Sequence, residues 1–180
     1  MSASRWKICR KRLISVAMLA LAIPLTTGAT GRINNLDDRV LAAHNRERAK
    51  LDIPALDWDP ALAADARIWG DHLARLGRLE HYPDNPADPD PEGENLWAGT
   101  RGYYSAESMV GLWIAERKNF KPGLFPNNTV TGNLEDVGHY TQLMWRSSHA
   151  VGCALIRGRY DEFLVCRYSE GGNVMGETPF

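Results

Sequence analysis

The chain has 180 residues, with 22 acidic and 21 basic side chains and a formal net charge of −1. It contains no internal repeat or low-complexity region, and its length corresponds to one ordinary domain with a real core. Without the basic N-terminal segment described next, the formal charge becomes −6. That charge disfavours nucleic acid or anionic lipid headgroups as partners held by charge alone.

Residues 1–29 have the pattern of an export signal. Five basic residues precede the apolar run Leu13 to Ile23, and the small residues Thr27-Gly28-Ala29 follow it. The apolar run is too short to span a bilayer. Cleavage near Ala29 would leave residues 30–180 as a single domain, secreted or periplasmic and without an integral membrane domain. An uncleaved N-terminal membrane anchor has the same pattern and remains the alternative.

Three longer helices are predicted in the first two thirds of the chain. The first is expected over Leu36 to Leu51. The second begins at Asp59-Pro60, with aspartate as the cap and proline at the first helical position, and runs to Gly77. The third is expected from Ser105 to Asn119. The predicted core stripes are Leu62, Ala66, Trp69, Leu73 and Leu76 on the second helix, and Met109, Leu112, Trp113 and Phe120 on the third.

The remaining segments alternate between irregular chain and short elements. Residues His81 to Thr100 are rich in proline and aspartate and predict one long loop, of a length that is usually functional in a compact domain. After a short helix containing His139, residues 150–158 and 161–169 predict an antiparallel hairpin. Helices and strands are segregated along the chain, so the predicted fold class is α+β.

The cysteines predict one disulfide. Cys9 is lost with the export signal, which leaves Cys153 and Cys166, one on each strand of the predicted hairpin. In an oxidising compartment such an even pair is expected to bond, and the bond would stabilise the fold by about 3 kcal/mol on the chain-entropy model. Two buried free thiols are the alternative. No C-x-x-C metal or redox motif is present.

Four side chains offer metal-binding or proton-transfer chemistry: His81, Glu94, Glu116 and His139. Glu116 lies on the apolar face of the third helix, and a buried carboxylate needs a partner, unless its side chain reaches solvent or a backbone donor. Glu94 could equally be a solvated loop residue, and His81 could complement the end of the second helical region. His139 and Gln142 are spaced i and i+3 on their short helix, so both could enter one cleft.

Two imidazoles and two carboxylates can hold a divalent metal or share protons, although the spacing does not show that they meet. The other histidines are predicted to be structural (His44 and His72) or to lie in a loop (His149). Nucleophilic catalysis is disfavoured because no G-x-S-x-G motif is present and the cysteines are expected to be bonded.

Several ordered motifs extend over nearly the whole chain after the export signal. They are His44-Asn45 with Arg48, LDWDPALAADA, GENLWAG, Trp113-Ile114-Ala115-Glu116, GHYTQLMWRSSHAVGCA, and Cys166-Arg167-Tyr168 followed by Gly172-Asn173 and Gly176. In this register the chain resembles the CAP superfamily, which comprises the cysteine-rich secretory, antigen 5 and pathogenesis-related class 1 proteins and is also called the SCP domain.

The resemblance implies a three-layer α-β-α sandwich with a central cleft. It assigns His81, Glu94, Glu116 and His139 to a cleft tetrad, with Gln142 as a neighbour, and implies that the two histidines are able to bind zinc or another divalent cation. The chain has fewer cysteines than plant and animal relatives, and no cysteine-rich domain follows. A venom-like channel-blocking role is therefore disfavoured.

Three functions are compatible with these residues. The favoured one is a secreted, non-enzymatic binding module for sterol, fatty acid or other lipid-like ligands, with the tetrad as its metal-tuned or structural centre. The second is a metal-assisted peptidase or hydrolase in which Glu94 or Glu116 is the general base. The third is an interaction domain whose tetrad only braces the fold. No catalytic residue is assigned, no organic cofactor is expected, and the sequence names no protein partner.

Overall fold

The computed structural model describes residues 31–180 except 84, 86 and 90, so the export signal predicted for residues 1–29 lies outside the described residues. The elements in chain order, with η denoting a 3-10 helix, are α1 Leu36–Arg48, η1 Ala49–Leu51, β1 Asp57–Trp58, α2 Pro60–Leu76, β2 Gly93–Thr100, α3 Ala106–Ala115, η2 Glu116–Asn119, η3 Leu134–Asp136, α4 Gly138–Leu143, β3 Ala150–Arg157 and β4 Asp161–Ser169. Within these ranges, none of the helices combines the length and apolar character needed to cross a membrane.

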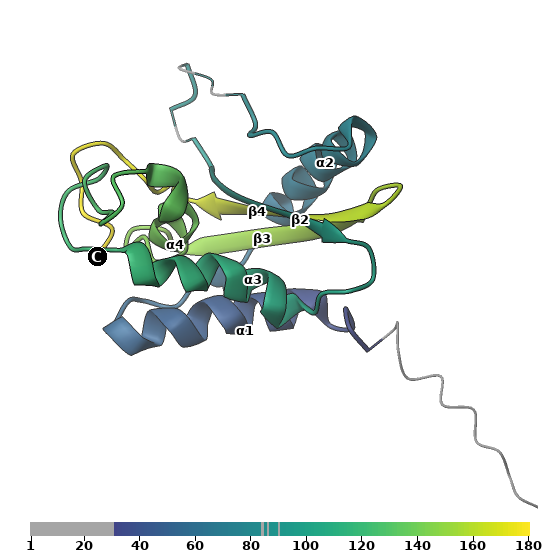
Figure 1. Cartoon of the computed structure of the whole chain (residues 1–180), viewed down its shortest axis with the longest axis horizontal. Helices are drawn as coiled ribbons and strands as arrows, with labels where there is room; N and C mark the ends of the chain where they lie inside the picture. The colour runs from purple at the N-terminus through teal and green to yellow at the C-terminus, as the bar shows by residue number, and fades with distance from the viewer. Residues whose placement is uncertain (1–30, 84, 86, 90) are drawn as a thin grey trace, which may run out of the picture.

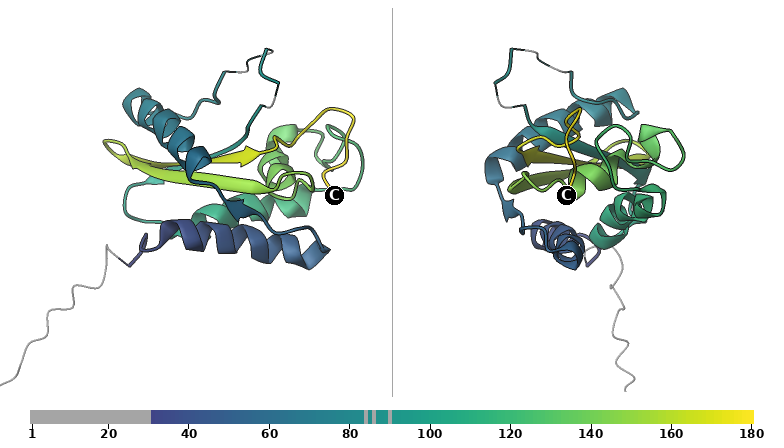
Figure 2. Two further views of the ribbon diagram at one scale, coloured as in Figure 1. Left: turned by 180° about the vertical axis from the view of Figure 1, so that it is seen from behind. Right: turned by 90° about the vertical axis from the view of Figure 1, so that its left-hand side faces the viewer.

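The elements form three layers around one sheet. The strand order is β1-β3-β4-β2, with β1 parallel to β3 and the other neighbours antiparallel. Helix α2 packs on one face of the sheet, and α1, α3 and α4 lie on the other (Figures 1 and 2). The α+β class and the α-β-α sandwich are therefore confirmed.

Both faces of the sheet are buried, which explains why the hairpin strands alternate only weakly in the sequence. The core on the α1 and α3 side contains Val151, Cys153, Leu164 and Cys166 from these strands. The core on the α2 side contains Ala154, Ile156, Phe163 and Val165. Each strand thus sends apolar side chains to both cores.

The ends of α2 are set by local sequence. The side chain of Asp59 accepts hydrogen bonds from the backbone N–H groups of Ala61 (2.7 Å) and Leu62 (3.4 Å). Gly77 ends the helix in a left-handed conformation at φ 74°. The predicted start and end of this helix are confirmed. Its predicted core stripe is wrong at Leu76, which is 39% exposed because it lies in the last turn, beyond the edge of the packed face.

The start of α2 lies directly against β3 at Gly152. A Cβ atom on this glycine would lie 2.2 Å from the backbone nitrogen of Ala63 and 2.4 Å from the carbonyl oxygen of Asp59. Only glycine fits this approach, since both obstructing atoms are backbone.

The predicted long loop is wrong in its second half. Residues Gly93–Thr100 form β2, which pairs with β4 from Gly93 opposite Tyr168 to Thr100 opposite Asp161. Two glycines and a buried asparagine weaken the local strand pattern, and pairing with β4 supplies the preference that the segment lacks.

On the third predicted helix, α3 and η2 together follow the predicted span. The prediction that Leu112 belongs to the core is wrong, because its side chain is half exposed.

Cys153 and Cys166 face each other across β3 and β4 and form a disulfide, as predicted. Both side chains are buried in the core on the α1 and α3 side. The disulfide therefore crosslinks the two strands of the hairpin inside the core.

Candidate functional site

Glu116 and His139 form the first of two histidine–carboxylate pairs. Glu116 begins η2, and His139 is the second residue of α4. Glu116 Oε1 lies 2.6 Å from His139 Nδ1, and Oε2 accepts hydrogen bonds from the backbone N–H groups of His139 (3.0 Å) and Tyr140 (3.1 Å). The partner that a carboxylate on this apolar helix face requires is thus the start of α4, whose free N–H groups it satisfies.

The His139 ring is held by its neighbours. The Trp113 ring is stacked on it with 6.0 Å between centroids and 10° between planes, and Trp113 Nε1 donates to the Leu96 carbonyl at 3.1 Å. Asn95 Nδ2 donates to the His139 carbonyl at 3.0 Å. Strand β2 and helix α3 therefore fix both the ring and the backbone of His139.

His81 and Glu94 form the second pair, at the opposite side of β2. His81 Nδ1 lies 2.7 Å from Glu94 Oε1, which also accepts from the Tyr82 backbone N–H at 3.1 Å. Glu94 Oε2 is in an ion pair with Arg167 Nη2 at 3.2 Å, too oblique for a hydrogen bond. The Glu94 side chain is 8% exposed, whereas the His81 side chain is 69% exposed. His81 lies beyond Gly77, the αL glycine that ends α2, so the alternative that His81 complements the C-terminus of this helix is wrong.

Both pairs have the same chemistry. In each, a carboxylate accepts from Nδ1, which assigns the proton to Nδ1 and leaves the lone pair on Nε2. This is the arrangement in which a carboxylate orients a histidine ligand and raises its basicity in metal sites. In both pairs a glutamate therefore orients the imidazole through its Nδ1 atom.

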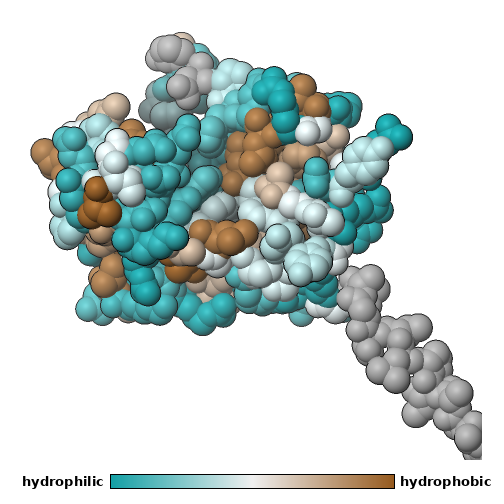
Figure 3. Space-filling model, viewed as in Figure 1, coloured by the Kyte–Doolittle hydropathy of each residue, from teal (hydrophilic) through white to brown (hydrophobic). Residues whose placement is uncertain are grey.

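A cavity of about 530 Å³ brings three of the four tetrad residues together. His81, Glu94 and His139 line it, whereas Glu116 lies behind His139 and supports it. Apolar surface lies beside a hollow on this face of the molecule (Figure 3). Across the residues that the structure describes, no three or more His, Cys, Asp or Glu side chains are grouped closely enough to hold a metal ion. The cavity therefore contains two imidazoles, each bonded to a glutamate through its Nδ1 atom.

A second cavity, of about 880 Å³, adjoins the first and shares His81, Glu94 and Asn173 with it. Gln142 lines this larger cavity, where its Oε1 accepts from the Gly172 backbone N–H at 2.8 Å. The i, i+3 spacing thus places His139 and Gln142 at adjoining cavities.

A buried arginine fixes the chain that follows α4. Arg48 is fully buried and donates to the carbonyls of Leu143 (3.0 Å), Trp145 (2.8 Å) and Ser148 (2.9 Å). Burial lowers the pKa of its guanidinium to about 10. Because these bonds tie α4 to α1, Arg48 positions His139 from a distance.

A hydrogen-bonded chain connects the core to the cleft. His44 Nδ1–H donates to the Val40 carbonyl, and His44 Nε2 accepts from the Tyr168 hydroxyl, each at 2.8 Å. Asn95 donates to the Tyr168 oxygen at 3.1 Å as well as to His139. Burial lowers the pKa of the His44 imidazole from 6.5 to about 4 and raises that of the Tyr168 hydroxyl.

The other histidines lie where the sequence suggested. His44 is structural, His72 stacks on Trp69 with 4.5 Å between centroids, and His149 is exposed in a loop. Sequence reasoning missed Asn95 and the part played by Trp113. The signal for Asn95 was an uncharged polar residue between the glutamate and the apolar residues of GENLWAG.

The layers and the paired histidines and glutamates define a small sandwich domain with a polar cleft. Residues 41–168 match the model of CAP, the cysteine-rich secretory protein family, and the chain belongs to this family.

Relatives and solved structures agree with this assignment. The chain is 33% identical to the pathogenesis-related protein PR-1 type of Sambucus nigra, over 93% of this chain and 95% of that protein. It is 33% identical to pathogenesis-related protein 1 of Arabidopsis thaliana, over 93% and 94%. The same fold occurs in the crystal structure of NaASP2 with Zn²⁺ (TM-score 0.65, 20% identity, 81% of this chain and 84% of that one) and in hookworm platelet inhibitor (0.63, 15%, 82% and 75%).

Proposed function

We propose that the protein is an exported, non-enzymatic binding protein whose cleft holds a divalent cation, zinc first among them, between His81 and His139. The observation that carries the proposal is that both Nδ1 atoms are bound to glutamate while both rings line one cavity. These residues fit zinc, which accepts imidazole nitrogen, and a bound ion would supply a Lewis acid for polar ligand groups. NaASP2, which shares the fold, has been crystallised with Zn²⁺.

The bonding of the carboxylates favours binding over hydrolysis. Both oxygens of Glu116 are engaged, by His139 Nδ1 and by two backbone N–H groups. Both oxygens of Glu94 are engaged, by His81 and Tyr82 and by Arg167. A general base needs an oxygen directed at the water it deprotonates. Catalytic zinc also commonly has three protein ligands, whereas this cleft offers two imidazoles.

The ligand proposed for the cleft is lipid-like. The larger cavity has apolar wall residues, among them Ile68, Trp69 and Tyr82, and the smaller one has Leu79 and Leu96. Their volumes, about 880 and 530 Å³, are in the range of small-molecule sites. An apolar chain along these walls would leave its polar head at the histidines. The export proposed for residues 1–29 accords with the secretory family to which the chain belongs.

Zinc titration by calorimetry tests the cation. The purified protein is expected to bind about one zinc ion per chain near neutral pH, with binding lost on acidification because protons compete for imidazole. The variant His81→Ala/His139→Ala is expected to give no heat. The matched control His72→Ala/His149→Ala removes two histidines outside the cleft and is expected to bind like the parent.

The outcomes separate the alternatives. Equal binding by both double variants would overturn the cation site, and absence of heat in the parent would favour a tetrad that only braces the fold. Turnover of a peptide substrate that chelation abolishes would overturn the non-enzymatic role. A lipid-exchange assay with sterol, fatty acid and phospholipid tests the ligand separately, because lipid binding without zinc binding would leave that part standing.

A further inference from the structure

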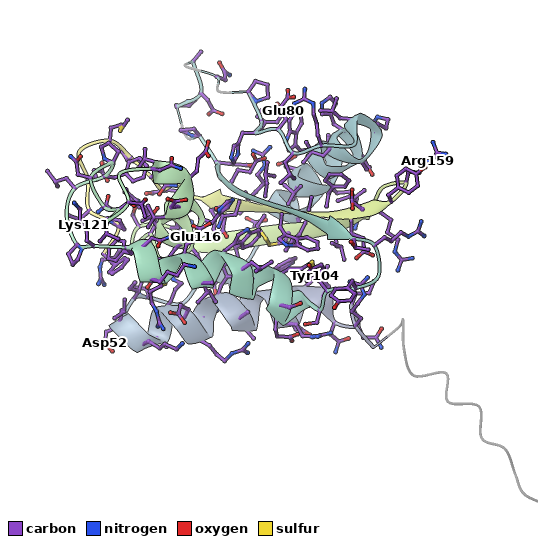
Figure 4. All side chains as sticks on the ribbon, viewed as in Figure 1. Asp52, Glu80, Tyr104, Glu116, Lys121 and Arg159 are labelled. Carbon is purple, nitrogen blue, oxygen red and sulfur yellow. A yellow bond between two sulfur atoms is a disulfide. The ribbon has the colours of Figure 1, made fainter. Side chains whose placement is uncertain are left out.

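Two surface turns project side by side from the end of the sheet that lies away from the cleft. The first follows β2 and the second joins β3 to β4, and the Arg101 backbone N–H donates to the Tyr160 carbonyl at 3.1 Å, which holds them together. Since β2 has eight residues, the turns lie about 26 Å from its cleft end. The exposed residues Arg101, Tyr103, Arg157, Arg159 and Tyr160 are here named the arginine–tyrosine tip. Arg159 marks this end of the molecule in Figure 4, opposite Lys121.

The tip combines unpaired positive charge with exposed aromatic rings. Tyr103 is 76% and Tyr160 70% exposed. The Arg159 guanidinium lies 5.0 Å from the centre of the Tyr160 ring. Among the described residues, Arg101 and Arg159 make no ion pair, and Arg157 lies 3.6 Å from a glutamate that also pairs with another arginine. The tip is therefore basic, although residues 30–180 carry a net charge of −6.

The base of the tip is firmly held. Arg32 donates to the buried Glu162 at 2.7 Å and to the Tyr104 carbonyl, and so connects β4 with the chain that follows the first turn. The Tyr104 ring packs edge-on against Trp97 of β2 with 5.0 Å between centroids. The exposed rings and guanidinium groups thus extend from a rigid support, so little backbone conformational entropy is lost when they bind.

The described chain also begins at this end, where Arg32 is bound (Figure 1). Nearby in the sequence is the apolar run Leu13 to Ile23 of the predicted export signal. If residues 1–29 were retained as the membrane anchor that the sequence leaves as an alternative, the domain would be tethered by the end that carries the tip. The surface nearest to a membrane would then be the tip.

We infer that the arginine–tyrosine tip binds the surface of a bilayer that contains anionic lipids. Guanidinium groups pair with phosphate, and tyrosine rings suit the headgroup region because one end of the ring is apolar and the other polar. The tip projects as two turns, a shape that fits between headgroups on a flat bilayer. The acidic side chains nearby, Asp161 at the start of β4 and Asp37 and Asp38 at the start of α1, limit the basic surface to the tip itself.

Vesicle co-sedimentation tests the inference with the purified exported protein, after mass spectrometry has confirmed that residues 1–29 are absent. Binding is expected to vesicles of phosphatidylcholine with phosphatidylglycerol, weaker at high salt, and not to pure phosphatidylcholine. Arg101→Gln/Arg159→Gln is expected to weaken binding on the order of 30-fold, at about fivefold per arginine. Tyr103→Ser/Tyr160→Ser is expected to weaken it without changing its salt dependence.

The control Lys118→Gln/Lys121→Gln removes the same charge from exposed positions at the opposite end. It is expected to bind vesicles like the parent. An equal loss in this control would overturn the inference, because it would show a general charge effect. No vesicle binding by the folded parent, or binding only to soluble polygalacturonate, would also overturn it, the latter in favour of an acidic polysaccharide. Circular dichroism confirms that each variant is folded.

Discussion

Acid is expected to destabilise the domain through the fully buried His44. The imidazole is neutral in the fold, because Nδ1–H donates to a carbonyl and Nε2 accepts from the Tyr168 hydroxyl. Burial lowers its pKa from 6.5 to about 4. The unfolded chain therefore takes up a proton at a higher pH than the folded one, so the stabilisation is complete above pH 6.5 and is lost as the pH falls toward about 4.

The size of the effect follows from the width of that interval. Each pKa unit corresponds to about 1.36 kcal/mol, so His44 alone should remove about 3 kcal/mol of unfolding free energy between neutral pH and pH 4. That loss is large compared with the roughly 5–15 kcal/mol of unfolding free energy that is typical of a domain. Protonation of His44 Nε2 also removes the acceptor of the Tyr168 hydroxyl group. The oxygen of that hydroxyl accepts a hydrogen bond from Asn95 beside the cleft.

Urea unfolding followed by tryptophan fluorescence, at several pH values between 7 and 4, measures the effect. His44→Gln is expected to be less stable at pH 7 but to lose less stability toward pH 4, by about 3 kcal/mol. Carboxylates titrate in both proteins, so the comparison isolates the histidine. His149→Gln, at an exposed loop position, is expected to follow the parent. Parallel pH profiles for the parent and His44→Gln would refute the reasoning.

Three further predictions concern the sheet, the cleft and the disulfide. Gly152→Ala is expected to cost about 3 kcal/mol in urea unfolding, because its Cβ would meet backbone. Gly111→Ala, in a helix with open space around it, is the control and should stabilise by up to about 1 kcal/mol. Glu116→Gln is expected to weaken zinc binding by about 10- to 100-fold in the calorimeter, and unchanged affinity would contradict its role behind His139. Cys153→Ala/Cys166→Ala is expected to lower stability by about 3 kcal/mol, close to the loss in either single variant, and a loss equal to the sum of the two single-variant losses would contradict a bond.

Local signals predicted most of the fold. Asp59 and Gly77 mark the ends of α2 by chemistry that acts within a few residues, as an N-cap and a left-handed C-cap. The hairpin and its disulfide were also local, because the two strands are joined by a short turn. The signal for strand β2 was not local. Its preference for extended structure comes from pairing along its whole length with β4, about seventy positions further on.

Prediction of the cleft from the sequence has a similar limit. The residue types of His81, Glu94, Glu116 and His139 drew attention to them, but their pairing depends on how β2, η2 and α4 meet. Glu116 was the most informative, because a carboxylate on an apolar helix face requires a partner, and the partner proved to be the start of α4. Asn95 could not be assigned, since its bonds reach two residues from other elements.

The two histidine–glutamate pairs differ in how firmly they are held. His139 is stacked on Trp113 and fixed through its carbonyl by Asn95, whereas the His81 ring is 69% exposed and lies on an irregular segment. Glu94, held in turn by Arg167, links that ring to the sheet. A cation between the rings would therefore meet one ligand already placed and draw the other to it. Its affinity would then depend on the segment around His81 as well as on the rigid core, since ordering that segment costs entropy that the fixed ligand does not.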